Sequence, residues 1–516
     1  MASDESPPGD EEVKVRRRKR KMQRRTTDIE ELTSAGHKAL QERRPQDAVS
    51  CFKEALKTAA QLQDSRVLRA CSFNLGAAYV EVGRPQKGMD FLQRAQPGPK
   101  AERLPDLQFN LALAHDKLGQ NREAAACFLQ AAQLYRSQGD GRSEGDACME
   151  MSRCYSRTEN RSLAVQGFLR AAESYRVSSM LDSAAIALKE AGSHMIQSDQ
   201  FSQDDVSSVL DACLSLTDSI TDLRTQGELY LSVGVLYCRL RCFQYGVDCF
   251  QRALGPAAQW PGLLAKVLHN LGAALNSVGR FRPAVEYHRV AAGLYGSLGC
   301  RGDQAQCFSN LAFARSELGD EEEAAESFIL ALQGFRDTED HMAEVQVCES
   351  LAECYLRQRK QQEAVRLYKR ALSTLVHCKE GGGVQDRLVE RLTAALQQKL
   401  TVSPQMPRPP RLRPLRSPVG QHVRKGDITQ SPAAAANQQS KERSGEVPAT
   451  EDSGRKEASP GPHRSEKPHH SERWLDRVTP QTDSEASLAQ EAQHASPGDM
   501  TAAPRSRWKS RFCLLM

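Results

Sequence analysis

The stretch Asn74-Leu75-Gly76-Ala77-Ala78-Tyr79 returns along the chain with small changes, and this recurrence decides the fold. Close copies begin at Asn110, Asn270 and Asn310, and looser copies centre on Met151, Val233 and Leu351. Leu271 and Leu311 lie 40 positions apart, and so do Leu311 and Leu351. A fixed internal period of this length is typical of a protein that stacks one supersecondary unit many times.

A second pattern follows the copies: a small residue, a large residue four positions on, and a small residue three further. The sets are Ala48/Phe52/Ala55, Gly88/Leu92/Ala95, Ala124/Phe128/Ala131, Ala164/Phe168/Ala171, Gly246/Phe250/Ala253, Ala284/His288/Ala291, Ala324/Phe328/Ala331 and Ala364/Tyr368/Ala371. This spacing places the three residues on one face of an α-helix. Each unit is therefore predicted to hold a helix A, which carries the Leu-Gly pair, and a helix B, which carries the small-large-small set.

Glycines such as Gly83, just after helix A, are expected to end that helix in the left-handed conformation. One pair of helices cannot bury its apolar face alone, so neighbouring pairs must stack. The sequence therefore predicts an all-α solenoid of helix-turn-helix units.

The two patterns together resemble the tetratricopeptide repeat (TPR) family. The resemblance covers residues 28–377 as about nine repeats, which are longer than the family's usual ~34 residues. It implies a right-handed superhelix whose A helices line a concave groove that binds partner proteins. In repeat length and in the Asn-Leu-Gly-x-x-Tyr wording, the units are similar to those of the Pins-type polarity adaptors.

Four asparagines occupy one position of helix A: Asn74, Asn110, Asn270 and Asn310. The Pins-type resemblance implies that asparagines at this position hold an extended peptide by its backbone amides. The Asn side chain suits this role because it both donates and accepts hydrogen bonds. The four residues are therefore predicted to line the partner-binding groove. The alternative is that each asparagine only braces its own repeat, and the sequence leaves both open.

The fifth unit departs from the pattern, because polar residues replace its small-large-small set. The expected positions fall on Asp204, Ser208 and Asp211, and a shifted apolar face would use Val206, Val209, Leu210 and Cys213. We expect an irregular joint over residues 197–225. Both a drifted repeat and a hinge between two subarrays would account for it.

Residues 1–27 hold a dense basic run and are predicted to be disordered, because like charges this close repel one another. The run extends from Lys14 to Arg25 and includes Arg16, Arg17, Arg18, Lys19, Arg20 and Lys21. These residues are candidates for a nuclear-import signal or a contact with anionic lipid. Nucleic acid is the less favoured partner, since no aromatic residues lie among the charges. A solvated tail without function also fits.

Three segments are predicted after the last repeat. Leu388, Leu392 and Leu396, at i, i+4 and i+8, predict a capping helix over 384–400 that covers the end of the solenoid. Residues 401–504 form a Pro/Ser-rich segment with few large apolar residues, which predicts disorder. Residues 505–516 form a basic tail with a terminal Cys-Leu-Leu-Met.

This ending fits a C-a-a-X motif and predicts prenylation of Cys513. The basic residues just upstream would strengthen membrane contact, because one lipid chain alone holds weakly. They are Arg505, Arg507, Lys509 and Arg511. An anionic membrane surface is therefore a second candidate partner beside a protein or peptide.

No catalytic motif is present: the chain has no P-loop, no His-Glu-x-x-His and no Gly-x-Ser-x-Gly. We therefore predict no catalytic residue, no metal site, no cofactor and no small-molecule substrate. The predicted function is a non-enzymatic scaffold or adaptor that binds a partner peptide or helix in the groove, in the cytoplasm or at a membrane periphery. The alternatives are a nuclear or nucleic-acid-associated adaptor and an enzyme regulator that sequesters a target helix.

Overall fold

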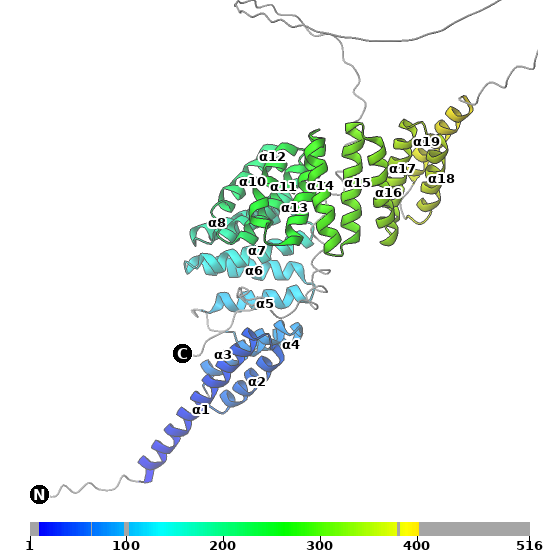
Figure 1. The fold of residues 1–516 in the computed structure, drawn as a ribbon. Coiled ribbons are helices and arrows are strands. Elements are labelled where there is room, and N and C mark those ends of the chain that lie inside the picture. Colours follow the sequence, from blue (N-terminus) through cyan, green and yellow to red (C-terminus); the bar gives the residue numbers. More distant parts are fainter. Residues whose placement is uncertain (1–9, 63, 97–102, 379–381, 402–516) are drawn as a thin grey trace, which may run out of the picture. The chain divides into compact units, whose positions relative to one another are not determined.

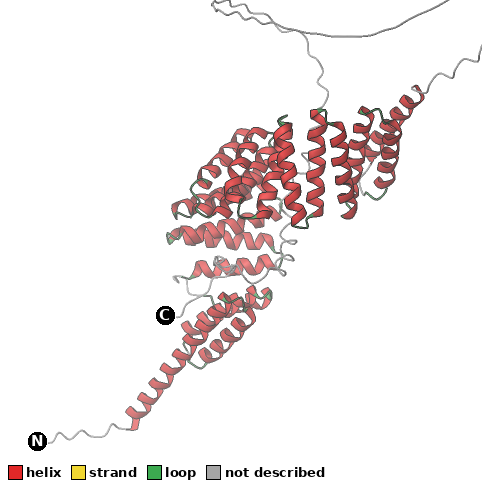
Figure 2. Cartoon of the chain, viewed as in Figure 1, coloured by secondary structure: helices red, strands yellow, loops and turns green. Residues whose placement is uncertain are grey.

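The computed structural model describes residues 10–62, 64–96, 103–378 and 382–401. These residues form nineteen helices and no strand (Figure 2). The helices are α1 (Asp10–Gln41), α2 (Pro45–Ala60), α3 (Ser65–Glu81), α4 (Pro85–Arg94), α5 (Leu104–Lys117), α6 (Asn121–Ser137), α7 (Gly141–Arg157), α8 (Arg161–Val177), α9 (Leu181–Ile196), α10 (Gln203–Thr217), α11 (Leu223–Arg239), α12 (Phe243–Ala257), α13 (Pro261–Ser277), α14 (Phe281–Ser297), α15 (Arg301–Leu318), α16 (Glu321–Asp337), α17 (His341–Arg357), α18 (Gln361–Leu375) and α19 (Gly382–Thr401).

The helices pair in chain order (Figure 1). Each odd-numbered helix from α1 to α17 is a helix A and packs on the helix B that follows it. Each helix B from α2 to α16 packs in turn on the next helix A. The predicted all-α architecture of stacked helical pairs is thereby confirmed. The surfaces discussed below all belong to one compact unit, which holds the described residues up to Leu396.

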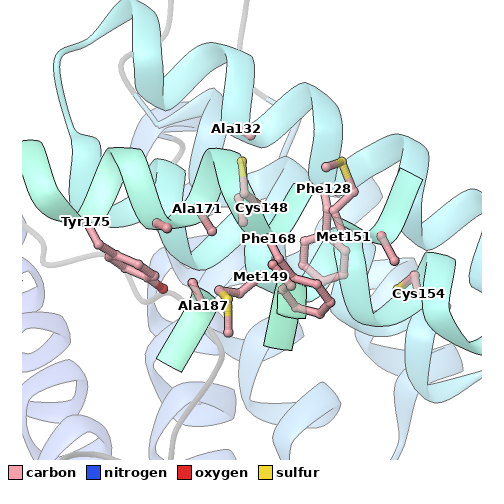
Figure 3. Packing of buried hydrophobic residues seen from close by; sticks show 14 of the residues in the cluster. Phe128, Ala132, Cys148, Met149, Met151, Cys154, Phe168, Ala171, Tyr175 and Ala187 are labelled. Atoms are coloured by element: carbon pink, nitrogen blue, oxygen red, sulfur yellow. The ribbon is translucent and has the colours of Figure 1, made fainter. Parts of the chain in front are cut away.

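The small-large-small sets of the B helices form the core. All of their residues are buried, and Phe128, His288 and Phe250 are 0% exposed. Figure 3 shows how Phe128 and Phe168 pack with Met149 and Met151 of α7, which lies between the B helices α6 and α8. Each helix A is therefore covered by its own helix B and by that of the preceding unit.

The glycine of helix A, where a unit has one, acts as a close-approach site. A Cβ at Gly234 would lie 2.5 Å from Cε1 of Phe250, and one at Gly36 would lie 2.6 Å from Cε1 of Phe52. Only glycine allows helices A and B of these pairs to come so near.

The A helices end as predicted where a glycine follows them: Gly83 and Gly319 have φ values of 80° and 87°. Four other A helices reach the same left-handed conformation without glycine, at Arg43, Glu159, Arg241 and Arg359.

At the N-terminus the structure differs from the prediction of disorder. Helix α1 includes residues 10–27 and continues without a break into the first repeat. No Pro or Gly interrupts residues 10–35, and Arg, Lys, Glu, Gln and Met are good helix formers. Because the folded repeat already provides the helix nucleus, each further residue only extends it. Residues 1–9 lie outside the described part.

The irregular fifth unit has a continuous core. Helix α10 begins at a capping box formed by Ser202 and Asp205. It buries Val206, Leu210 and Cys213, the shifted apolar face that the sequence predicted, while Val209 is half-buried. These residues belong to one hydrophobic cluster with side chains of α9 and α11. This continuity favours a drifted repeat over a hinge.

Helix α19 packs on the last repeat at the place predicted for a capping helix. Leu388 is 0% exposed and joins the core of α17 and α18, and Arg387 Nε donates to Glu349 Oε1 over 3.0 Å. Glu349, on α17, is only 1% exposed, so this ion pair anchors α19 to the repeat. The predicted disordered segment 401–504 lies outside the described residues except for Thr401 at the end of α19. Among the described helices, none is both long enough and apolar enough to cross a bilayer.

Candidate interaction surface

The A helices form the closely packed side of the stack. Successive A helices contact one another directly at α3/α5, α9/α11, α11/α13 and α13/α15. Hydrogen bonds between A helices one unit apart hold them in register. Lys117 Nζ donates to the carbonyl oxygen of Val80 over 2.6 Å, and His194 Nε2 lies 3.2 Å from Ser156 Oγ. Arg157 also pairs with Asp116 of the preceding helix A.

The four asparagines predicted to line a groove are buried. Asn74 and Asn110 are 0% exposed, Asn310 is 6% exposed and Asn270 is 9% exposed. Asn270 Nδ2 donates to the carbonyl oxygen of Lys266, one turn earlier in its own helix, over 2.8 Å. Asn310 Oδ1 accepts from Gln306 Nε2, again one turn earlier. Burial and these local bonds favour the alternative role, in which each asparagine braces its own repeat.

The same face of helix A is more open on either side of the asparagine position. We define the A-face stripe on the A helices from α7 to α17. It consists of the residues four positions before and three positions after the asparagine position, together with the residue at that position where it is accessible. Its accessible members are Asp146, Arg153, Ile186, Ser193, Glu228, Val235, Lys266, Ala273, Gln306, Phe313, Gln346 and Glu353, together with Glu190 and Ser350 at the central position. On α3 and α5 only Ala70 and Asp106 remain partly open.

The stripe is largely polar, since ten of its fourteen accessible members are polar or charged, and several of its charges form local pairs. Arg153 pairs with Glu150, and Lys189 Nζ lies 2.6 Å from Glu190 Oε1. Asp146 accepts from the Tyr175 hydroxyl over 2.8 Å, which fixes its carboxylate against α8. Such a surface offers carboxylates, amides and hydroxyls at repeated intervals, which are the groups that bind a peptide backbone or the polar face of a helix.

The residues of the predicted nuclear-import or lipid contact are described in part. The side chains from Arg16 to Lys21 are all exposed on α1. Their exposure is compatible with any anionic partner and selects none. Cys513 and the basic residues 505–511 lie outside the described residues, so prenylation stays a prediction.

The strongly perturbed titratable groups lie mostly in the core and not on the stripe. Burial lowers the pKa of His288 well below its usual value, and burial raises the pKa of Cys148 and of Cys213 to about 12. These thiols are therefore protonated at neutral pH and are poor nucleophiles. In the described ranges, no three His, Cys, Asp or Glu side chains are grouped so as to hold a metal ion.

The architecture and this surface define a class of protein, the α-helical repeat proteins that present a continuous polar face. The family model described as Tetratricopeptide repeat matches residues 303–375, which hold α16 to α18 and most of α15. The model described as Soluble NSF attachment protein, SNAP, matches residues 100–208. The chain thus carries repeats of the tetratricopeptide kind, which the family model matches over residues 303–375. Repeats of this family are typical of protein–protein interaction scaffolds and adaptors.

Several solved structures are similar to this chain. The apo form of RapI is 11% identical, with 69% of this chain and 99% of RapI covered and a TM-score of 0.47. The apo form of the quorum sensor NprR from B. thuringiensis is 12% identical, with coverage of 68% and 99% and a TM-score of 0.38. BtubC (BKLC) from P. vanneervenii is 16% identical, with coverage of 50% and 97% and a TM-score of 0.34. At these identities and TM-scores we transfer no function from them.

Proposed function

We propose that this protein is a non-enzymatic adaptor that binds a peptide or helix of a partner protein along the A-face stripe. The observation that carries the proposal is the stripe itself, which places at least one accessible polar side chain on each of six consecutive A helices. A surface with this periodicity matches a ligand that is itself extended or helical, because each repeat then meets the next segment of the same ligand.

The binding residues proposed here differ from the asparagines singled out in the sequence. Glu190 and Lys266 lie on α9 and α13, are partly exposed, and can reach a ligand without any rearrangement of the core. The four buried asparagines, on α3, α5, α13 and α15, would serve to hold the A helices straight and correctly spaced.

A charge-exchange experiment tests the proposal. Partners of the wild-type protein are first collected by proximity labelling in cells and then tested by pull-down. The double variant Glu190→Lys/Lys266→Glu should lose them, because both changes place the wrong charge on the stripe. The matched control Glu173→Lys/Lys369→Glu makes the same exchange at exposed positions of the B helices α8 and α18 and should keep them. Equal binding by both variants, with unchanged melting temperatures, would place the partner site elsewhere.

Membrane tethering through Cys513 is a separate proposal, supported only by the sequence motif and the basic residues before it. Metabolic labelling with a farnesyl analogue should mark the wild type and not the Cys513→Ser variant. Equal labelling of the two would remove the anchor from the proposed function without affecting the adaptor role.

A further inference from the structure

A surface separate from the A-face stripe lies on the projecting N-terminal part of α1. We name this part, residues 15–25, the basic arm. Arg25 Nη1 donates over 3.0 Å to the carbonyl oxygen of Gln61, the residue that follows α2. The arm therefore extends beyond the end of its partner helix (Figure 1). Eight of its eleven residues are basic and none is acidic.

The basic arm also carries an uncovered apolar line. Val15 and Met22 are 60% and 54% exposed, and they lie seven residues apart. Ile29, seven residues further, is 1% exposed and packs in the cluster of Ala55, Ala59 and Cys71. The apolar face that packs on the first repeat therefore continues into the arm, where the described chain leaves it uncovered. Positively charged Arg18 and Lys19 flank this line on its two sides.

A complementary surface lies on α16, which we name the acidic face. Glu322, Glu326, Ile329 and Gln333 follow one another at i, i+4, i+7 and i+11, so they share one side of the helix. Ile329 and its neighbour Leu330 are 49% and 52% exposed, and both glutamates are exposed. Helix α16 contains five acidic residues and one basic residue. Among the described B helices, α16 combines exposed large apolar side chains with the strongest excess of acid.

We propose that the basic arm of one copy of this chain docks on the acidic face of α16 of a second copy. The two surfaces match in charge and in their exposed apolar residues. They also match in length, since the eleven residues of the arm span about 16 Å and the twelve from Glu322 to Gln333 span about 18 Å. The phosphate backbone of a nucleic acid would satisfy the arginines but would leave Val15 and Met22 uncovered. This inference does not depend on the A-face stripe.

The contact is heterologous, because one copy uses its arm and the other its acidic face. Each dimer therefore keeps one free arm and one free acidic face, and further copies add head to tail into a ring or a filament. Three turns of helix bury less than the ~1,000 Å² expected of a stable interface, so the association is weak and concentration-dependent. It must also weaken with salt, because exposed charges are screened.

Analytical ultracentrifugation of the full chain tests the proposal with two charge-reversed variants. Arg18→Glu/Lys19→Glu places two carboxylates beside the apolar line of the arm, and Glu322→Lys/Glu326→Lys places two ammonium groups on the acidic face of α16. Each variant alone should be monomeric at concentrations where the wild type associates, with the apparent Kd raised about tenfold or more. An equimolar mixture of the two should associate again, because positions 18 and 19 of each variant then meet oppositely charged residues at positions 322 and 326 of the other.

The matched control is Arg17→Glu/Arg20→Glu, which makes the same change of charge on the side of the arm away from Val15 and Met22. It should weaken association clearly less than Arg18→Glu/Lys19→Glu. The proposal is overturned if the wild type is monomeric at about 100 μM in low salt, a concentration at which contacts of this size are populated. It is also overturned if the mixture stays monomeric, if the control is as damaging as the test variant, or if the arm binds an RNA duplex or phosphatidylserine vesicles while the chain does not self-associate.

Discussion

The substitution Gly234→Ala tests the close approach of helices A and B. The new Cβ would lie 2.5 Å from Cε1 and 2.8 Å from Cδ1 of Phe250. Carbon atoms prefer about 3.5–4.0 Å, so the ring would have to move by roughly 1 Å. Phe250 is 0% exposed, and a shift of the ring or of α12 disturbs the core around it. Overpacking of this kind costs about 1–3 kcal/mol, whereas alanine gains up to about 1 kcal/mol over glycine within a helix.

The net expectation is a loss of about 1–2 kcal/mol in the free energy of unfolding of the segment around α11 and α12. Gly293→Ala in α14 is the matched control, because a Cβ there has no atom within 4 Å. It should stabilise by about 0.5–1 kcal/mol. Urea unfolding followed by circular dichroism at 222 nm measures both, and hydrogen exchange of α11 and α12 locates the effect. If Gly234→Ala were as stable as Gly293→Ala, the two helices would not pack as closely as the structure shows.

Three further predictions concern single residues. His288→Phe places in the sixth small-large-small set the ring that most other repeats carry. Burial holds the pKa of His288 below that of the unfolded chain, so its neutral form contributes stability above about pH 6.5 that is lost on acidification. The free energy of unfolding of the variant relative to the wild type should therefore grow by up to about 1.4 kcal/mol per pH unit between pH 6.5 and 5. A melting-temperature difference that does not change with pH would contradict this. Arg359→Gly should raise the free energy of unfolding by about 1 kcal/mol, because Arg359 has a φ of 60°, a left-handed conformation that glycine adopts without strain. An unchanged or lower urea midpoint would contradict this. Glu349→Ala leaves Arg387 and Arg391 without their shared carboxylate, so hydrogen exchange of α19 should become at least about tenfold faster. If α19 were protected equally in the variant and the wild type, it would be held by its apolar contacts alone.

Much of the fold could be predicted from the sequence because the pattern is local and repeated. The small-large-small spacing is a property of one helix, and eight copies of it agree with one another, so errors in one unit are corrected by the rest. The same spacing also identified the drifted unit, where Val206, Leu210 and Cys213 take over the buried face. The helix over residues 10–27 was not predicted, because charge density alone does not show that these residues extend a helix of the first repeat.

The sequence by itself determined that the fold is all-helical, how the helices pair and which residues form the core. These features follow from a periodicity within about 40 residues. Only the tertiary structure decided which side chains remain accessible. Asn74 and Asn110 occupy a position on helix A that a single pair would leave open, but the neighbouring pairs cover it in the stack. Exposure depends on contacts between units, which no pattern within one unit records. For the same reason, the A-face stripe and the acidic face of α16 became visible only once the helices were stacked.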